Sequence, residues 1–333
     1  MNDSKLNGVA IFPTGIGLKI SGDASAGSVI ALLAKSCERL IVNPNGCNAS
    51  DIYVGTSNTL YTEGSTINRF LSGDINLKEC KTNNKILCVV NKPILPANIN
   101  AMNASKWTLG ADITLLALDT TLTMEAFINN EGLADGKLTG VDELIAQVKD
   151  LDFDILCVHT YISCPKEVSD SYWEGKLLVN PWGKVEQLLS SRVSSRINRQ
   201  CVHAPIETEF NTLFDTKVVS LQQAAEIISN TYCHCIYSGA HHAPTIDITK
   251  NNKNLSNTDI DFMVSPYNCW STPHIACMDN NIPIIVVKEN ITCLKDIIYP
   301  DNNNIIFVEN YLEAAGILQA MNAGIDYKLI TLK

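Results

Sequence analysis

The chain has 333 residues, a length that predicts two domains, because a single hydrophobic core rarely extends over more than about 250 residues. Hydrophobic residues make up 46% of the chain and charged residues 18%, a composition typical of folded globular proteins and not of disordered segments. The net charge of −10, with scattered Lys and Arg residues, excludes the class of proteins that bind nucleic acid through a basic surface.

The first residues lack the basic patch and apolar stretch of a signal peptide, and no apolar run is long enough to span a bilayer. The chain has 12 cysteines without a CxxC pair, and most of them lie in apolar segments, where a thiol packs as a small core residue. Such cysteine usage is typical of a reducing compartment. The sequence therefore predicts a cytoplasmic protein that has no membrane partner, and it leaves open assembly into a homo-oligomer.

Short apolar segments alternate with helical patterns along most of the chain. Several of these segments are continuous apolar runs, which favours strands of a parallel sheet covered on both faces. Strands are predicted at residues 9–13, 39–43, 85–91, 113–118, 154–159, 232–237, 260–265, 282–288 and 304–308. Helices are predicted at residues 25–38, 99–107, 141–148, 185–193, 221–229, 273–279 and 310–323.

This order of elements is typical of α/β proteins, and we expect two Rossmann-like domains with mainly parallel sheets and an interdomain cleft. Periodicity is weakest between residues 164 and 181, and the predicted domains cover residues 1–160 and 161–333. The last predicted helix is a candidate to pack back on the first domain. Open α/β sheets bind ligands at the carboxyl ends of their strands, so we expect the site there.

The clearest local pattern is a strand–loop–helix junction near the carboxyl terminus. A polar loop follows the strand at residues 260–265, and then Thr272 is the predicted N-cap and Pro273 the predicted first residue of a helix. Backbone N–H groups at this helix start, with the hydroxyls of Ser271 and Thr272, are suited to bind a carboxylate or phosphate. Glu289 and Asn290 follow the next strand and are expected at the same edge. The alternative interpretation is a capped structural helix with an incidental polar loop.

Several residues are candidates for catalysis. Cys269 lies just before this helix, where the pKa of its thiol is expected to be low, as a nucleophile requires. His203 and His242 each begin a His-Ala-Pro tripeptide and are candidates for general acid–base chemistry. His241 and His242 are weaker candidates for a metal site, and no metal is predicted because no HExxH or CxxC spacing accompanies them. The sequence identifies no cofactor, and a structural role is the alternative for each residue.

Two polar segments in the amino-terminal half are candidates for contacts with a substrate. The first follows the strand at residues 9–13, where glycines allow the backbone to approach a ligand, although the spacing is not GxGxxG. The second follows the strand at residues 39–43 and is rich in amides, which also form ordinary turns. The candidate residues are Thr14, Gly15, Gly17, Asn45, Asn48 and Glu63.

Short motifs occur in a fixed order at residues 9–17, 43–45, 58–64, 203–205, 289–292 and 311–314. Cys269 and Ser271 lie between the fourth and the fifth of these motifs. Together they resemble a family catalogued as a domain of unknown function, number three-three-two-six, over residues 8–325. The chain departs from the family pattern at Asn43, where we expect His, and at residues 270–272, where we expect Gly-Gly-Ser. The resemblance implies no reaction, but it favours the polar loops as the site because these are the segments that match.

We therefore expect a metabolic enzyme that acts on a small carboxylated or phosphorylated metabolite, with isomerase, lyase or hydrolase chemistry favoured. Its anionic group is expected at Ser271 and Thr272, and Glu289 or His203 is expected to act as acid or base. A racemase, isomerase or lyase that depends on Cys269 is the sharper alternative. A non-catalytic small-molecule-binding or regulatory protein with the same cleft is the rival from another class.

Overall fold

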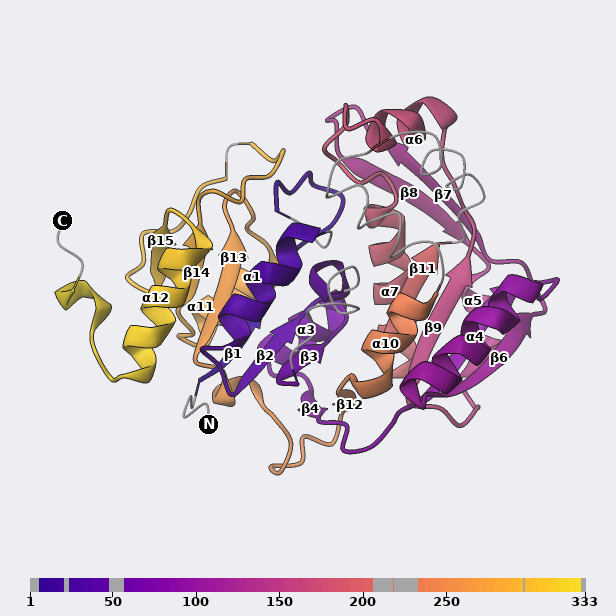
Figure 1. The fold of residues 1–333 in the computed structure, drawn as a ribbon, viewed down its shortest axis with the longest axis horizontal. Coiled ribbons are helices and arrows are strands. Elements are labelled where there is room, and N and C mark those ends of the chain that lie inside the picture. Colours follow the sequence, from indigo (N-terminus) through magenta and orange to yellow (C-terminus); the bar gives the residue numbers. More distant parts are fainter. Residues whose placement is uncertain are drawn as a thin grey trace.

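The computed structural model of the chain describes residues 6–20, 24–47, 57–205, 218, 233–295 and 297–330. Its architecture is α/β, with two sheets of parallel strands that lie next to each other and carry helices on their faces (Figure 1). This confirms the predicted α/β class with mainly parallel sheets.

The larger sheet has six strands, all parallel, in the order β15-β14-β13-β1-β2-β3. Successive residues point to opposite faces, so that Val9 packs into one core and Ala10 into another. Both faces are covered, which explains why the strands are continuous apolar runs. The strands are β1 (Asn7–Ala10), β2 (Arg39–Val42), β3 (Thr59–Tyr61), β13 (Phe262–Pro266), β14 (Ile284–Val287) and β15 (Ile305–Val308).

Two pairs of helices cover this sheet. Helices α1 (Ala24–Ala34) and α12 (Tyr311–Asn322) pack on one face, whereas α3 (Gly64–Leu71) and α11 (Thr272–Asp279) pack on the other. The side-chain amide of Gln319 on α12 donates to the hydroxyl of Ser36, just after α1, at 2.8 Å. The last long helix of the chain therefore packs against the first.

The smaller sheet has four parallel strands in the order β11-β9-β5-β6, all from the middle of the chain. Helices α4 (Pro96–Leu109) and α10 (His234–His242) pack on one face, and α5 (Val141–Val148) and α7 (Gly183–Ile197) pack on the other. The strands are β5 (Lys85–Asn91), β6 (Asp112–Leu118), β9 (Ile155–Thr160) and β11 (Cys201–Pro205).

The remaining elements connect or flank the two sheets. Antiparallel strands β7 (Thr123–Ile128) and β8 (Ala134–Thr139) form a hairpin, which β10 (Ile162–Ser163) extends and α6 (Lys166–Trp173) follows. Strands β4 (Asn76–Lys78) and β12 (Thr245–Asp247) pair where the chain passes from one sheet to the other and back. Short 3-10 helices occur at η1 (Asn257–Asp259) and η2 (Tyr327–Leu329).

The sheets group the chain in a way that linear order does not reveal. The larger sheet combines β1, β2 and β3 from the start of the chain with β13, β14 and β15 from its end, whereas the smaller sheet uses residues between 85 and 205. The division into domains at residues 1–160 and 161–333 stays a prediction.

The strand predicted at residues 232–237 is wrong, because residues 234–242 form helix α10. Cys235, Ile236, Tyr237 and Ala240 are all buried, since α10 contacts α4, the smaller sheet and β3. A short helix that is apolar on most of its surface has the same sequence pattern as a buried strand. The helix predicted at residues 221–229 lies outside the described residues.

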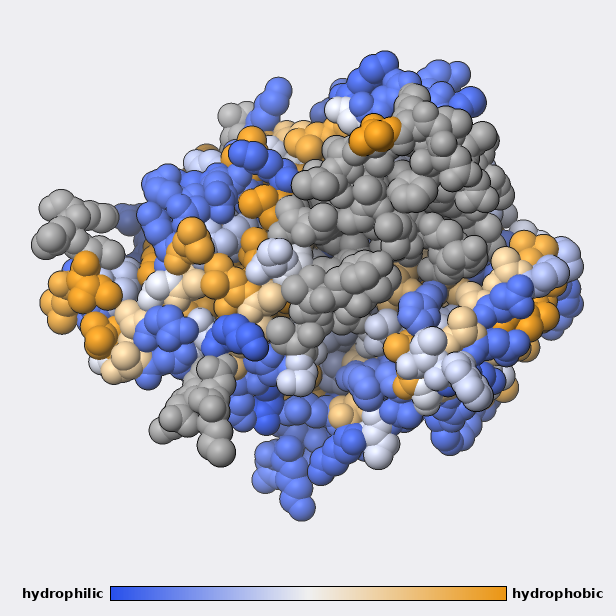
Figure 2. Space-filling view, in the orientation of Figure 1, coloured by the Kyte–Doolittle hydropathy of each residue, from blue (hydrophilic) through white to orange (hydrophobic). Residues whose placement is uncertain are grey.

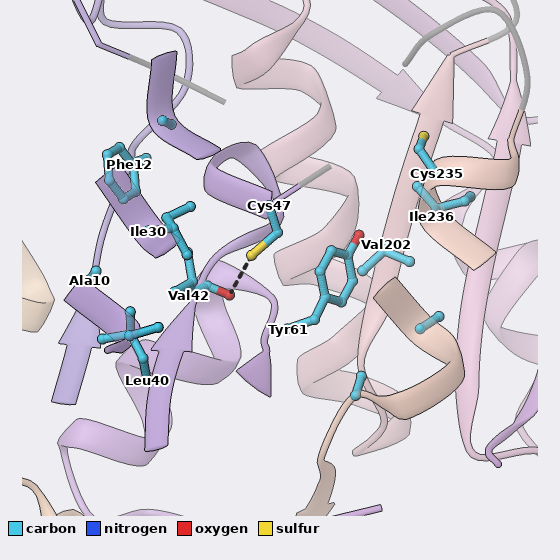
Figure 3. Packing of buried hydrophobic residues seen from close by; sticks show 14 of the residues in the cluster. Ala10, Phe12, Ile30, Leu40, Val42, Cys47, Tyr61, Val202, Cys235 and Ile236 are labelled. Atoms are coloured by element: carbon cyan, nitrogen blue, oxygen red, sulfur yellow. Dashed lines mark hydrogen bonds between the residues drawn. The ribbon is translucent and has the colours of Figure 1, made fainter. Parts of the chain in front are cut away.

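One hydrophobic core continues from the larger sheet to the smaller one. Figure 3 shows Tyr61, at the end of β3, between the residues of β2 and those of β11 and α10. A Cβ atom at Gly239 would lie 2.5 Å from the Tyr61 ring, so α10 can pack against this ring only through a glycine. The two sheets thus share apolar contacts as well as loops.

The visible surface is mostly hydrophilic, with apolar residues over α4 and near the carboxyl terminus (Figure 2). The exposed large hydrophobic side chains of the described residues include Trp107 on α4, which is 91% exposed, and Leu329 on η2. None of the helices in the described part of the chain has the length and apolar character needed to cross a membrane.

Candidate functional site

A cavity of about 570 Å³ lies between the loops of the two sheets. The larger sheet contributes the residues that follow β1, β2 and β3 and the loop from β13 to the start of α11, all at the carboxyl ends of strands. The smaller sheet contributes β11 and the first two turns of α7. Small-molecule sites have this size, and α/β sheets bind ligands at this edge.

Seven of the residues predicted from the sequence line this cavity. The structure brings together around one cavity segments that are up to about 250 residues apart in the chain. Asn48 lies outside the described residues. The seven residues are Thr14, Asn45, Glu63, His203, Cys269, Ser271 and Thr272.

Glu289 and Asn290 do not line the cavity. The exposed Glu289 accepts a hydrogen bond from the backbone N–H of Tyr311 at 3.0 Å and so caps α12. The amide of the buried Asn290 accepts from the Ile20 N–H and donates to the Ile20 carbonyl and to the Tyr311 hydroxyl. Both side chains hold α12 to its neighbours, so the structure gives them contacts with protein where the sequence predicted contacts with substrate.

Gly15 and Gly17 shape the loop after β1 without lining the cavity. Both have positive φ, 76° and 68°, which favours glycine. A Cβ atom at Gly17 would lie 2.4 Å from the sulfur of Cys293. The Gly15 carbonyl accepts a hydrogen bond from the N–H of Ala134, at the start of β8. These glycines therefore allow the loop to approach other protein segments, and not the predicted ligand.

The start of α11 is a hydrogen-bonded cap, with Ser271 at the N-cap position that was predicted for Thr272. The buried His274 accepts the Ser271 N–H at Nδ1, over 3.1 Å. Its Nε2 must then carry the hydrogen and donate to the hydroxyl of Ser265, 2.7 Å away. Burial lowers the pKa of His274 to about 4, so this imidazole is neutral and serves as a scaffold.

Cys269 lines the cavity, but its thiol is buried. Burial raises its pKa to about 12, and a hydrogen bond with Ser265 opposes this effect only in part. The low pKa predicted from its place before a helix is therefore wrong, because loss of hydration outweighs the helix dipole. The thiol is protonated at neutral pH and lacks the thiolate that nucleophilic attack requires.

Glu63 lies at the start of α3, where its carboxylate is the N-cap. Oε1 accepts the N–H of Ser65 at 2.8 Å, and Oε2 accepts the N–H of Thr66 at 2.9 Å and the hydroxyls of both residues. Burial raises the pKa of Glu63, and these hydrogen bonds oppose the rise. The carboxylate is committed to its own helix, so its role at the cavity wall is structural.

Within the described part of the cavity lining, Glu186 and His203 form the one carboxylate–imidazole pair. The Oε1 atom of Glu186, on α7, lies 3.0 Å from Nδ1 of His203, on β11. The His203 side chain is only 1% exposed, whereas that of Glu186 is 23% exposed. Glu186 is thus the member of the pair that a ligand can contact, and the histidine predicted from the sequence lies behind it.

The far side of His203 also has a partner. Its Nε2 lies 3.2 Å from the hydroxyl of Thr160, and that hydroxyl lies 3.4 Å from the sulfur of Met124. A neutral imidazole with the hydrogen on Nδ1 accepts from Thr160 at Nε2. Both ring nitrogens of His203 therefore have a partner in the protein.

Lys184, on the first turn of α7, is the only Lys or Arg among the described residues that line the cavity. Its exposed ammonium donates to the side-chain carbonyl of Gln187 at 3.1 Å. Neither Lys184 nor Glu186 was predicted, because α7 carries no sequence motif and Glu186 lies 17 residues from His203. The signal that could have found them is a Gly-Lys-x-Glu start of a helix next to a buried His-Ala-Pro strand.

His241 and His242 lie at the end of α10, away from the lining of the cavity. His242 Nδ1 lies 3.0 Å from the Thr82 carbonyl, and burial lowers the pKa of His241. Within the part of the chain that the structure describes, no group of three or more His, Cys, Asp or Glu residues is placed to hold a metal ion. The alternative of a metal site at these two histidines gains no support.

Comparison with known proteins identifies a curated relative from Synechococcus sp., named an uncharacterised lipoprotein. It is 26% identical over 339 residues, which cover 96% of this chain and 92% of the relative. This name contradicts the predicted cytoplasmic location, which we withdraw. No solved structure matches the chain.

The family comparison confirms the resemblance seen in the sequence. The model of the family described as "Protein of unknown function (DUF3326)" matches residues 7–331, nearly the whole chain. The matched range includes every residue that lines the cavity. The chain therefore belongs to the DUF3326 family of proteins of unknown function.

Proposed function

We propose that the protein is an enzyme that converts a small carboxylated or phosphorylated metabolite in this cavity. In this proposal the two sheets belong to two Rossmann-like domains, and the cavity is the cleft between them. The observation that carries this proposal is the Glu186–His203 pair in the wall of the cavity. A carboxylate oriented by a buried imidazole is an arrangement suited to general acid–base catalysis.

In this proposal Glu186 is the catalytic residue and His203 is its positioning residue. The Nδ1–H of His203 holds Oε1, and Oε2 has no hydrogen-bond partner among the described residues. Oε2 is thus available to accept a proton from a bound substrate and to return it. Removal of a proton next to a carbonyl or from a hydroxyl is compatible with isomerase, lyase or hydrolase chemistry.

The substrate's anionic group has two favourable neighbours on opposite walls. Lys184 supplies a positive charge, and the hydroxyls of Ser271 and Thr272 lie at the positive end of the α11 dipole. Because Lys184 and Glu186 project from the same helix start, binding at Lys184 would place the rest of a small substrate near the carboxylate. The version that depends on a Cys269 thiolate is disfavoured by the raised pKa of this thiol.

Mass spectrometry of the small molecules released from denatured protein identifies the ligand, and a turnover assay with that ligand tests the proposal. We expect turnover by the wild type and a loss of about 100-fold or more in Glu186→Gln. Glu289→Gln is the matched control, because Glu289 is an exposed carboxylate outside the cavity. Binding without turnover by the wild type would identify a non-catalytic binding protein, and equal turnover by both variants would reject Glu186.

A further inference from the structure

The polar groups that line the cavity are mostly uncharged. Among the described residues that line it are five with side-chain amides and five with hydroxyls, against one Lys and no Arg. Two carboxylates, those of Glu63 and Glu186, also face this space. A ligand with several negative charges would therefore meet one cation and two anions, an unfavourable balance. The lining selects for a ligand with many neutral polar groups and little charge.

Some of these neutral groups are already used by the protein. The amide of Asn43 bonds to the N–H and carbonyl of Phe12, and the Asn45 side-chain NH₂ donates to the carbonyls of Phe12 and Pro13. Ser65 donates its hydroxyl to Glu63. These side chains fix the loops around the cavity, and they explain part of its amide content without any ligand.

Other groups have no protein partner among the described residues. They are the side-chain oxygen of Asn45, the amide of Asn68 on α3, and the hydroxyls of Ser190 on α7 and Thr272 on α11. They come from four segments that line one cavity: α3, α7, α11 and the residues that follow β2. Polar groups in a partly buried space are satisfied by water or by a ligand, and an amide presents a donor and an acceptor together.

A ligand hydroxyl is the group that matches such a lining, because it both donates and accepts. The partly exposed Trp270 also lines the cavity and offers apolar surface beside the polar groups, whereas Trp182, also in the lining, is only 5% exposed. A compact molecule with apolar C–H faces and a rim of hydroxyls complements both kinds of surface. Lys184 adds a place for a single negative charge.

We propose that the cavity binds a polyhydroxylated molecule with one anionic group, of the class of sugar phosphates and sugar acids. This inference deepens the proposed function and rests on it for the assignment of the cavity as the site. The phosphate or carboxylate contacts Lys184, and the hydroxyls contact Asn68, Ser190 and Thr272.

Calorimetric titration of the full chain tests this proposal with a panel of pentose and hexose phosphates, hexuronic acids, inorganic phosphate and succinate. We expect at least one sugar phosphate or hexuronic acid to bind about tenfold more tightly than inorganic phosphate and succinate. Tighter binding of succinate, or no binding of any sugar-derived anion, would overturn the proposal.

Substitutions of the proposed contact residues test which side chains bind the ligand. Asn68→Ala and Ser190→Ala should each weaken the best sugar anion about 3- to 10-fold, and Lys184→Met should abolish its advantage over the neutral parent sugar. Asn103→Ala, an exposed amide on α4 outside the cavity, is the matched control and should bind like the wild type. If Asn68→Ala and Ser190→Ala bind like this control, the hydroxyl contacts are wrong.

The two proposals fail in different ways. A sugar anion that binds but is not converted rejects the enzyme and keeps the ligand class. Conversion of an acid without hydroxyls, with the expected loss in Glu186→Gln, keeps the enzyme and rejects the ligand class.

Discussion

The starts of α11 and α7 both line the same cavity, one from each sheet, but they differ in chemistry. The start of α11 has a capping residue, a proline and a cysteine, the pattern that sequence reasoning favours for a site. Its titratable side chains, Cys269 and His274, are buried and neutral. The start of α7 has no such pattern, yet it contributes the exposed Lys184 and the partly exposed Glu186 to the lining.

This difference teaches that a capped helix start marks an edge of a site more reliably than it identifies the reacting groups. The polar residues at the start of α11 form hydrogen bonds with one another, so their presence is explained by a structural role without a ligand. The pairing of Glu186 with His203 across α7 and β11 has no such local explanation. Reactivity is accordingly expected on the α7 side, and stability on the α11 side.

The largest expected effect concerns the α7 side. His203→Gln should lower kcat about 10- to 100-fold and shift the pH–rate profile, because Glu186 loses an imidazole neighbour that can carry a proton. The double variant Glu186→Gln/His203→Gln should have a kcat less than about threefold below that of Glu186→Gln alone, since the two residues act as a unit. Steady-state kinetics with the ligand identified by mass spectrometry measures both. Full additivity would show that the residues act independently.

The next effect concerns the α11 side. Burial lowers the pKa of His274 to about 4, below its value in the unfolded chain, so the unfolded state binds more protons between about pH 6.5 and 4. The free energy of unfolding should therefore fall as pH drops through this window, by about 2 to 3 kcal/mol from His274 alone at pH 4.5. Urea unfolding at pH 7 and pH 4.5 measures this loss.

His274→Asn supplies the comparison for that measurement. It should be less stable at pH 7 and should lose less stability at pH 4.5 than the wild type does. Burial also lowers the pKa of His159 to about 4, so some dependence on pH should persist in the variant. Equal pH dependence in both proteins would show that His274 is not a buried neutral scaffold.

A smaller effect is expected where the loop after β1 meets α7. A Cβ atom at Gly183 would lie 2.1 Å from the hydroxyl oxygen of Thr14 and 2.7 Å from the Gly15 nitrogen. Gly183→Ala should therefore lower the free energy of unfolding by about 1 to 2 kcal/mol. It should also lower the affinity for the ligand, because Thr14 lines the cavity. Gly316→Ala on α12 has open space and should be neutral or stabilising. Thermal unfolding that ranks the two in the opposite order would contradict this packing.

The smallest effect is expected at Glu289. Glu289→Gln weakens the contact with the Tyr311 N–H at the start of α12, at a cost of about 0.5 to 1 kcal/mol in unfolding free energy. Turnover should stay unchanged. A large loss of turnover with intact stability would return Glu289 to the site and break the contrast drawn above.

The sequence was sufficient for the fold class and for seven residues of the cavity. Apolar runs such as 85–91 predicted parallel strands because a sheet covered on both faces leaves no polar positions. The polar loops could be found because parallel strands bring their carboxyl ends to one edge.

Long-range pairing accounts for what the sequence did not reveal. Glu186 meets His203 only because α7 packs on β11, and a helix without a motif gives no sign of this contact. Burial reversed the expected pKa shift of Cys269, and burial cannot be read from the loop that contains it. Helix α10 was mistaken for a strand because it is buried on most sides.

A crystal structure of the protein with the metabolite released from it would show whether the ligand contacts the start of α7. We expect the metabolite in the cavity between the two sheets, with one of its atoms within hydrogen-bond distance of Glu186 and its anionic group at Lys184. A metabolite bound elsewhere, or bound in this cavity against Cys269 without contact to Glu186, would contradict this expectation.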